Sequence, residues 1–239
     1  MPIAFWKTCL HSPQTKRLSF DLPDEIVVPY CTLVNYRSKP TNNLEAQAKT
    51  FCENVKGGRT TRIKKAIDWI VQEDAGQPIV DFVGDATLVP VPKSHPIQAN
   101  TMWPSRIIAE HMVAAGLGRE VSPIIKRTKA VPKSAFAKTK EDRPSIQTHS
   151  ESLHVEILTE QPDTFVLVDD VITLGRTTMT CALKLLEAYP DAEVKVFCLI
   201  GTVHKNSPYP GFVLPKFSTL SYYYFENDYY GLDVTRRNT

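Results

Sequence analysis

The chain has 239 residues, 42% of them hydrophobic and 23% charged, which predicts one sizeable globular domain, alone or with a small appendage. Its 28 Lys and Arg against 26 Asp and Glu give a formal net charge of +2, so bulk charge gives no argument for binding nucleic acid or a membrane surface. No apolar stretch approaches the roughly 20 residues that cross a bilayer, and the first residues lack a secretory pattern. We therefore expect a cytoplasmic protein without membrane contact.

The N-terminal third of the chain predicts an extended arm followed by a helical cap. Prolines at positions 2, 13, 23, 29 and 40 favour an arm or a small cap over residues 1–40. Apolar residues at helical spacing then predict a helix over 41–56, with Asn42 or Asn43 as its N-cap, and a second helix over about 60–73.

The middle of the chain predicts an α/β core in which strands and helices alternate. Strands are expected at about 86–92, 121–127, 154–158, 165–168 and 193–203, helices at 101–115 and 176–188, and a polar, lysine-rich connector at 128–150. This order predicts parallel βαβ units and an open, mostly parallel sheet flanked by helices. The chain then divides into the N-terminal arm and helical cap (1–80), the core (81–205) and a C-terminal tail (206–239) packed on the core or at an interface.

Two adjacent carboxylates follow the most apolar of these strands. Residues 165–168 are uniformly hydrophobic, which is typical of a strand buried on both faces of a parallel sheet, and Asp169 and Asp170 end the run. Ligands of open α/β sheets bind beyond the carboxyl ends of the strands, so the two acids belong to a candidate site. Carboxylates accept hydrogen bonds from sugar hydroxyls, and they hold Mg²⁺ directly or through water.

A phosphate-binding turn is predicted directly after the acids. Its five residues can each contribute an N–H, a hydroxyl or a charge: Thr173, Leu174, Gly175, Arg176 and Thr177. Gly175 permits a close backbone approach or a positive φ, and the helix that follows offers N-terminal N–H groups to an anion. Acids followed by such a turn predict a site for a ribose 5-phosphate group. The alternative is an acid pair that caps the helix or binds a metal alone.

Residues 165–177 closely resemble the motif with which type I phosphoribosyltransferases bind phosphoribosyl pyrophosphate (PRPP). The resemblance implies that Asp169 and Asp170 are the catalytic pair, that Mg²⁺ is the cofactor and that the turn binds the 5′-phosphate. It further implies transfer of the phosphoribosyl group to a nucleobase or other nitrogen acceptor, with release of pyrophosphate. Leu174 departs from the family, which usually has a small or hydroxylated residue there, so one side-chain donor is missing.

An earlier loop matches the pyrophosphate-binding loop of the same family. Residues 88–94 (LVPVPKS) end an apolar strand, and the resemblance makes Pro92, Lys93 and Ser94 pyrophosphate ligands, with a cis peptide bond made affordable by the proline. An exposed proline-rich turn is the alternative. The layout over residues 86–203 is closest to the ComF branch of the family. The zinc-binding cysteines common at the N-terminus of that branch are absent, so the resemblance implies the catalytic domain and not a role in DNA uptake.

The lysine-rich connector matches the mobile hood loop that closes over pyrophosphate in this family. Three of its basic residues are possible clamps, namely Lys133, Lys138 and Arg143. A solvated surface loop and a contact to nucleic-acid phosphates remain alternatives for the same residues.

The C-terminal tail carries an aromatic segment, and its role stays open between several partners. Residues 222–230 hold five tyrosines and Phe225, which favours an edge strand or a surface for a homodimer or a protein partner. Stacking on nucleobases is a further use, so nucleic-acid binding is left undecided. The alternative to an enzyme is a non-catalytic regulator that binds PRPP or a nucleotide, or an effector subunit of a multi-protein system such as defence or DNA uptake. No segment indicates the acceptor.

Overall fold

A seven-stranded sheet forms the centre of the computed structural model, which describes residues 25–132, 139, 143–225 and 228–238, with side chains up to residue 223. The strand order is β3-β2-β6-β7-β1-β8-β9. The strands are β1 (Glu25–Tyr36), β2 (Thr87–Pro90), β3 (Glu120–Val121), β6 (Thr164–Ile172), β7 (Glu193–Thr202), β8 (Val213–Phe225) and β9 (Asp228–Asn238). Neighbours from β3 to β1 pair in parallel, whereas β8 and β9 join in antiparallel fashion. The expected α/β class with a mostly parallel sheet is confirmed.

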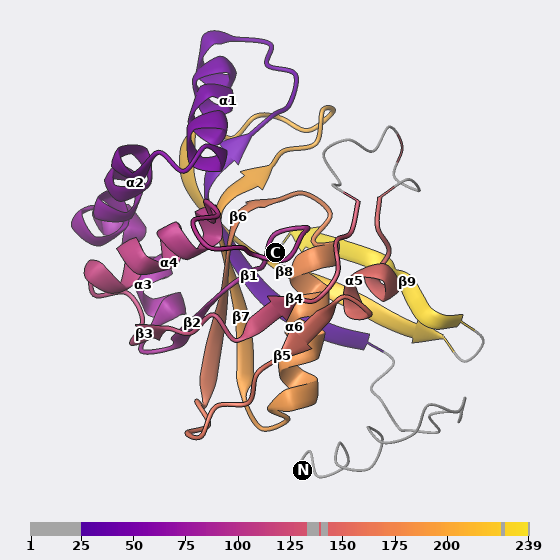
Figure 1. Ribbon diagram of the computed structural model, residues 1–239. Helices are drawn as coiled ribbons and strands as arrows, with labels where there is room; N and C mark the ends of the chain where they lie inside the picture. Colours follow the sequence, from indigo (N-terminus) through magenta and orange to yellow (C-terminus); the bar gives the residue numbers. More distant parts are fainter. Residues whose placement is uncertain (1–24, 133–138, 140–142, 226–227, 239) are drawn as a thin grey trace, which may run out of the picture.

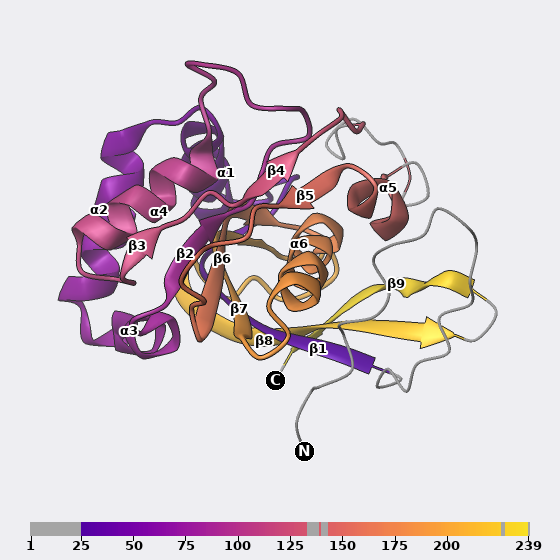
Figure 2. The ribbon, with the colours of Figure 1, turned by 60° about the horizontal axis from the view of Figure 1, so that its bottom comes forward.

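Helices cover both faces of this sheet (Figures 1 and 2). They are α1 (Asn43–Lys56), α2 (Thr60–Gln72), α3 (Gln77–Val83), α4 (Pro104–Ala114), α5 (Ile146–Ser150) and α6 (Arg176–Ala188), with a 3-10 turn at Asp74–Gly76 before α3. One face carries α1 to α4, and the other carries α6, α5 and a separate antiparallel pair, β4 (Ile125–Arg127) with β5 (Leu153–Val155). The helices expected at 41–56, 60–73, 101–115 and 176–188 are all present, and the Asn42 side chain caps α1.

The expected N-terminal arm is in part a strand inside the sheet. Residues 25–36 form β1, which lies between β7 and β8. Pro29 favoured an arm because proline cannot donate to a sheet ladder. In the structure β1 pairs with β8 from Glu25 onward, but its pairing with β7 begins only at Tyr30. Among the described strands, Pro29 therefore stands where β1 pairs with β8 alone, just before its pairing with β7 begins.

Two other strands differ from the sequence expectation. The strand expected over 121–127 is two strands in different sheets, because β3 pairs with β2 at the sheet edge while β4 pairs with β5. The strand before the acids continues through them to Ile172, because β6 keeps its pairing with β7 up to Gly201. The acids are thus held in the sheet ladder instead of standing in a loop after it.

The C-terminal tail extends the sheet. β8 pairs antiparallel with β1, and β9 pairs with β8. Tyr222 is 2% exposed and belongs to the core, so this tyrosine is not available to stack on a base. A homodimer or partner surface on this segment stays a prediction.

Within the described part of the chain, every helix is too short or too polar to span a bilayer. The cytoplasmic location expected from the sequence stays a prediction.

The apolar core fills both sides of the sheet, and β6 contributes to each side in turn. Phe165 and Leu167 pack on the α6 face, whereas Val166 and Val168 pack on the α1–α4 face. All four are 0% exposed, which confirms the expectation of a strand buried on both faces. The Phe165 ring also lies 4.9 Å from the Tyr189 ring, in a tilted arrangement.

Phe165→Ala is expected to lower the free energy of unfolding by about 3–5 kcal/mol, because it opens a cavity among fully buried neighbours. Chemical denaturation measures the loss. Val27→Ala in β1 is the matched control, since Val27 is 49% exposed, and should cost under about 1 kcal/mol. Equal losses in the two variants would contradict this description of the core.

Candidate functional site

A large cleft opens at the carboxyl ends of β6, β7 and β1 and has a volume of about 1230 Å³. It is lined by most of the residues that the sequence singled out: Arg143, Asp169, Asp170, Thr173, Leu174, Gly175, Arg176 and Thr177. These residues come from one strand, the turn after it, the start of α6 and the end of the connector. The fold therefore brings the acid pair, the predicted phosphate turn and one predicted clamp together in what we call the main cleft.

Asp169 is tied to helices on both faces of the sheet. Its Oδ1 accepts hydrogen bonds from the Ser105 hydroxyl at the start of α4 (3.1 Å) and from the Asp170 N–H (2.9 Å). Its Oδ2 accepts from the Thr178 hydroxyl in α6 (3.4 Å). Burial, and then the neighbouring Asp170 carboxylate, raise the pKa of Asp169 well above its usual range. Ser105 and Thr178 were not predicted from the sequence, where they look like ordinary helix residues.

The turn after the acids has the geometry of an anion site at a helix N-terminus. Gly175 is the N-cap of α6 and has a φ of +81°, a conformation that only glycine adopts readily. A Cβ at this position would come within 2.7 Å of Leu220 Cδ2, so the turn lies close to β8 as well. Among the described residues no side chain caps α6. The N-terminus of this 13-residue helix therefore faces the cleft with its backbone N–H groups and its positive dipole end.

Arg176 connects this turn to the end of the connector. Its Nη1 donates to the carbonyl oxygens of Arg143 (3.0 Å) and Pro144 (3.4 Å), which holds the Arg143 backbone beside the turn. Arg143 also lines the main cleft, and its role as a clamp stays a prediction. Lys133 and Lys138, the other two predicted clamps, lie outside the described residues.

The predicted pyrophosphate loop follows β2, the strand that pairs with β6, but its residues do not line the main cleft. Pro90 pairs with Val168, and the N–H of Val91 donates to the Val168 carbonyl (2.9 Å), so Pro92 follows directly. Described residues contain no cis peptide bond, which corrects the expectation for Pro92.

The Lys93 side chain and the Ser94 backbone are used within the fold. Lys93 Nζ donates to the Met102 carbonyl (2.9 Å), and the Ser94 carbonyl accepts from the Val131 N–H (2.7 Å). Neither Pro92, Lys93 nor Ser94 is among the residues that line the main cleft. Their role as pyrophosphate ligands stays a prediction.

A buried polar network that the sequence did not predict joins this loop to the phosphate turn. Arg127 donates from Nε to the Lys93 carbonyl (3.0 Å) and from Nη1 to the Ser152 hydroxyl, and Nη1 lies 3.4 Å from His149 Nδ1. The other ring nitrogen of His149 lies 3.2 Å from the Thr177 hydroxyl. Burial, followed by the charges of Arg127 and Arg176, lowers the pKa of His149 to about 4. His149 lies in the lysine-rich connector, and nothing in the sequence around it indicated that it would join Arg127 to Thr177.

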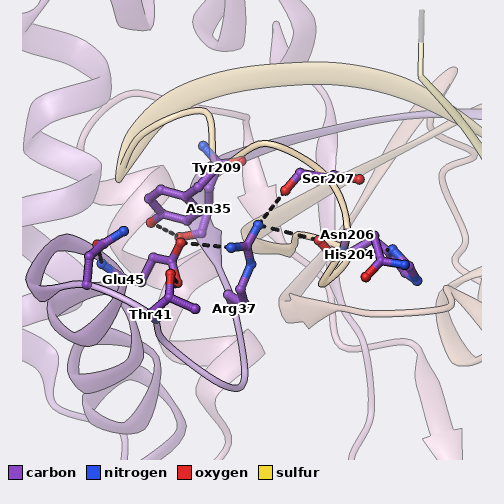
Figure 3. Close-up of polar contacts among 9 residues, drawn as sticks. Asn35, Arg37, Thr41, Glu45, His204, Asn206, Ser207 and Tyr209 are labelled. Carbon is purple, nitrogen blue, oxygen red and sulfur yellow. Dashed lines mark hydrogen bonds and ion pairs between the residues drawn. The ribbon is translucent and has the colours of Figure 1, made fainter.

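A second buried network, around Arg37, holds the loop after β7 that lines part of the main cleft (Figure 3). Arg37 Nη1 and Glu45 Oε1 form an ion pair at 2.9 Å, and both side chains are almost completely buried. Arg37 Nη2 donates to the carbonyl of Ser207 (2.5 Å) and more weakly to that of His204 (3.5 Å). The Tyr209 ring lies 5.7 Å from the guanidinium carbon. Arg37 thus fastens the loop after β7 to the end of β1 and to α1.

The acid pair fits the Mg²⁺ that the resemblance implies. Mg²⁺ prefers oxygen ligands and is usually held by one or two carboxylates, with water and substrate phosphates completing its shell. Asp169 and Asp170 supply such carboxylates at the cleft wall. Among the described residues no group of three or more His, Cys, Asp and Glu side chains forms a denser metal site.

Comparison with protein-family models gives no match for this chain, and comparison with curated proteins gives no significant match.

Asp169→Asn is expected to raise the thermal midpoint at neutral pH. A raised pKa in the folded state stabilises the fold below the ordinary aspartate pKa, and this contribution is lost as the pH rises through the raised value. The amide removes the negative charge from this half-buried position and keeps the shape, so its advantage should shrink toward pH 4. Thermal melts from pH 4 to 8 measure it, with Asp191→Asn at an exposed turn as the control. A lower midpoint for Asp169→Asn at neutral pH would contradict the raised pKa of Asp169.

His149 is expected to make the fold sensitive to mild acid. Because its pKa falls from 6.5 to about 4 on folding, it contributes stability above pH 6.5 that is lost as the pH falls toward 4. The loss from pH 7 to pH 4 is about 3 kcal/mol. Urea unfolding at pH 7 and at pH 4 measures this loss of unfolding free energy, and His149→Gln should remove about 3 kcal/mol of it. An equal loss in the unaltered protein and in His149→Gln would show that His149 is not the group responsible.

Proposed function

We propose that this protein is a Mg²⁺-dependent phosphoribosyltransferase of type I, which transfers the phosphoribosyl group of PRPP to a nitrogen acceptor and releases pyrophosphate. The observation that carries the proposal is the arrangement of the main cleft. Asp169 and Asp170 stand at the end of a buried parallel strand, and a left-handed glycine then starts α6 at the same cleft wall. Two acids and an open helix N-terminus side by side suit a ribose 5-phosphate group, which has hydroxyls at one end and a dianion at the other.

Each part of the site has a task in this proposal. The acid pair accepts hydrogen bonds from the ribose hydroxyls, and the backbone of residues 173–177 binds the 5′-phosphate. Arg143 and Arg176 add positive charge close to that phosphate. Ser105 and Thr178 hold the Asp169 carboxyl in place from two helices, so the ribose is bound by a group that is already positioned.

The reaction breaks the bond between ribose C1 and the pyrophosphate oxygen, and the electron pair leaves with pyrophosphate. The acceptor nitrogen forms the new bond to C1 and loses its proton to solvent. Positive charge develops on the sugar ring in the transition state, close to the two acids, which favours it electrostatically. Bound Mg²⁺ would neutralise charge on the departing pyrophosphate.

A second candidate is a regulator that binds PRPP or a nucleotide without turnover. It is favoured by Lys93, whose amino group is hydrogen-bonded to the Met102 carbonyl instead of facing the cleft. Leu174, which lacks a hydroxyl donor, agrees with this candidate. Release of pyrophosphate in the presence of PRPP, Mg²⁺ and a panel of nucleobases separates the two functions.

The double variant Asp169→Asn, Asp170→Asn is expected to bind PRPP more than tenfold more weakly and to release no pyrophosphate, because both ribose acceptors lose their charge. Isothermal titration measures binding and a coupled pyrophosphate assay measures turnover. Asp191→Asn should match the unaltered protein in both. Full PRPP binding or full turnover by the double variant would overturn the proposed function.

A further inference from the structure

The Thr177 hydroxyl lies between the main cleft and the buried His149 ring. Thr177 is the second residue of α6 and lines the cleft, and its Oγ1 lies 3.2 Å from His149 Nε2. Thr180, in the same helix, does not line the cleft, and its hydroxyl donates to the Arg176 carbonyl (2.7 Å). A hydroxyl has a single hydrogen to donate. Whether Thr177 can donate to a bound anion therefore depends on which atom donates in its contact with His149.

Arg127 decides the direction of that contact. A guanidinium has donors only, and Arg127 Nη1 lies 3.4 Å from His149 Nδ1. A hydrogen on Nδ1 would face these donors and their positive charge, so Nδ1 is the accepting nitrogen of the ring. The ring is neutral at pH 7, because burial and then the charges of Arg127 and Arg176 lower the pKa of His149 to about 4. A neutral imidazole with a bare Nδ1 has its hydrogen on Nε2.

This tautomer leaves the hydroxyl hydrogen of Thr177 available to a ligand. His149 Nε2 donates to Thr177 Oγ1, so the oxygen acts as an acceptor toward the ring and its own hydrogen is not used there. The opposite tautomer would accept that hydrogen and leave Thr177 without a donor for the cleft. The N-terminal N–H groups of α6 face the same cleft and favour an anion there.

The His149 ring is held in its orientation by the protein alone. His149 is 3% exposed, and its carbonyl accepts a hydrogen bond from the Ser152 hydroxyl (2.7 Å). Arg127 is fixed as well, since it donates from Nη1 to Ser152 Oγ and from Nε to the Lys93 carbonyl (3.0 Å). The donor that these contacts direct toward the cleft is therefore in place before a ligand binds, which lowers the cost of ordering it.

We propose that His149 is a positioning residue of the phosphate site, which donates from Nε2 to Thr177 Oγ1 and so makes the Thr177 hydroxyl a donor to a bound phosphate monoester. His149 does not line the main cleft, so it acts through Thr177. Leu174 in the same turn has no side-chain donor, which makes the direction of the Thr177 hydroxyl matter more for the ligand. This inference rests on the proposed function, whose 5′-phosphate site it completes.

The tautomer is measured on the unaltered protein. Long-range ¹H–¹⁵N NMR spectra of protein labelled with ¹⁵N-histidine distinguish the two neutral tautomers from the imidazolium. The chain has six histidines, and the signals of His149 are those that disappear in His149→Gln. We expect a neutral ring with its hydrogen on Nε2 at pH 7. A hydrogen on Nδ1, or a charged ring at pH 7, would overturn the inference.

A double-mutant cycle tests whether His149 acts through the hydroxyl. Isothermal titration measures the binding of ribose 5-phosphate. Thr177→Val removes the donor and should weaken binding about tenfold, and His149→Leu should weaken it about three- to tenfold. In the double variant, His149→Leu should add less than about twofold to the loss caused by Thr177→Val. Thr177→Ser keeps the hydroxyl and should bind as the unaltered protein does. Thr180→Val is the matched control, because its hydroxyl does not line the cleft.

The outcomes separate this inference from the proposed function. If His149 only supports the backbone of the turn, His149→Leu weakens binding equally with and without the Thr177 hydroxyl, and this result would overturn the inference alone. Thermal melts check that each variant is folded, and the NMR measurement decides the inference if His149→Leu does not fold. Absence of ribose 5-phosphate and PRPP binding by the unaltered protein would instead overturn the proposed function, and the inference with it.

Discussion

The pairing of β6 with β2 on one side and β7 on the other is the constraint on which the rest of the site depends. The apolar residues 165–168 of β6 are fully buried by helices on both faces of the sheet, so this strand can neither shift nor rotate without exposing them. A slip of one residue would move every side chain to the opposite face. Asp169 and Asp170 are thereby fixed relative to the helices that cover the sheet, and the turn into α6 has to leave the sheet at one place.

Two buried arginines then attach the loops of the site to this scaffold. Arg127 joins the loop after β2 to His149 and so to the phosphate turn, while Arg37 joins the loop after β7 to β1 and α1. Burying an arginine is costly unless its donors are satisfied, and here backbone carbonyls and polar side chains satisfy most of them. These hydrogen bonds hold the backbone of the loop after β2 and of the loop after β7 in place.

Near α6 the main cleft combines two carboxylates with a helix N-terminus, and lysines contribute to its lining as well. The hydrogen-bonded Lys93 fits the proposed function least well, because a pyrophosphate ligand would be expected to face the cleft.

The sequence by itself determined the elements whose evidence is local. Helical spacing of apolar residues predicted α1, α2, α4 and α6, and the continuous apolar run predicted a doubly buried strand, because side-chain periodicity follows directly from helix and strand geometry. The acids and the turn after them were likewise visible as one segment, since all of their residues are consecutive. That segment is the part of the site that could be predicted without the fold.

Only the tertiary structure decided what depends on pairing between distant segments. Pro29 argued against a strand until β8 was seen to pair with β1 where β7 does not, and Ser105 acquired its role only because α4 starts beside Asp169. Arg37 is 8 residues from Glu45 but 170 from Ser207, so no local pattern could show that it fixes the loop after β7. Local patterns fix which residues can form an element. Burial and hydrogen bonding between elements decide which of those residues meet at the site.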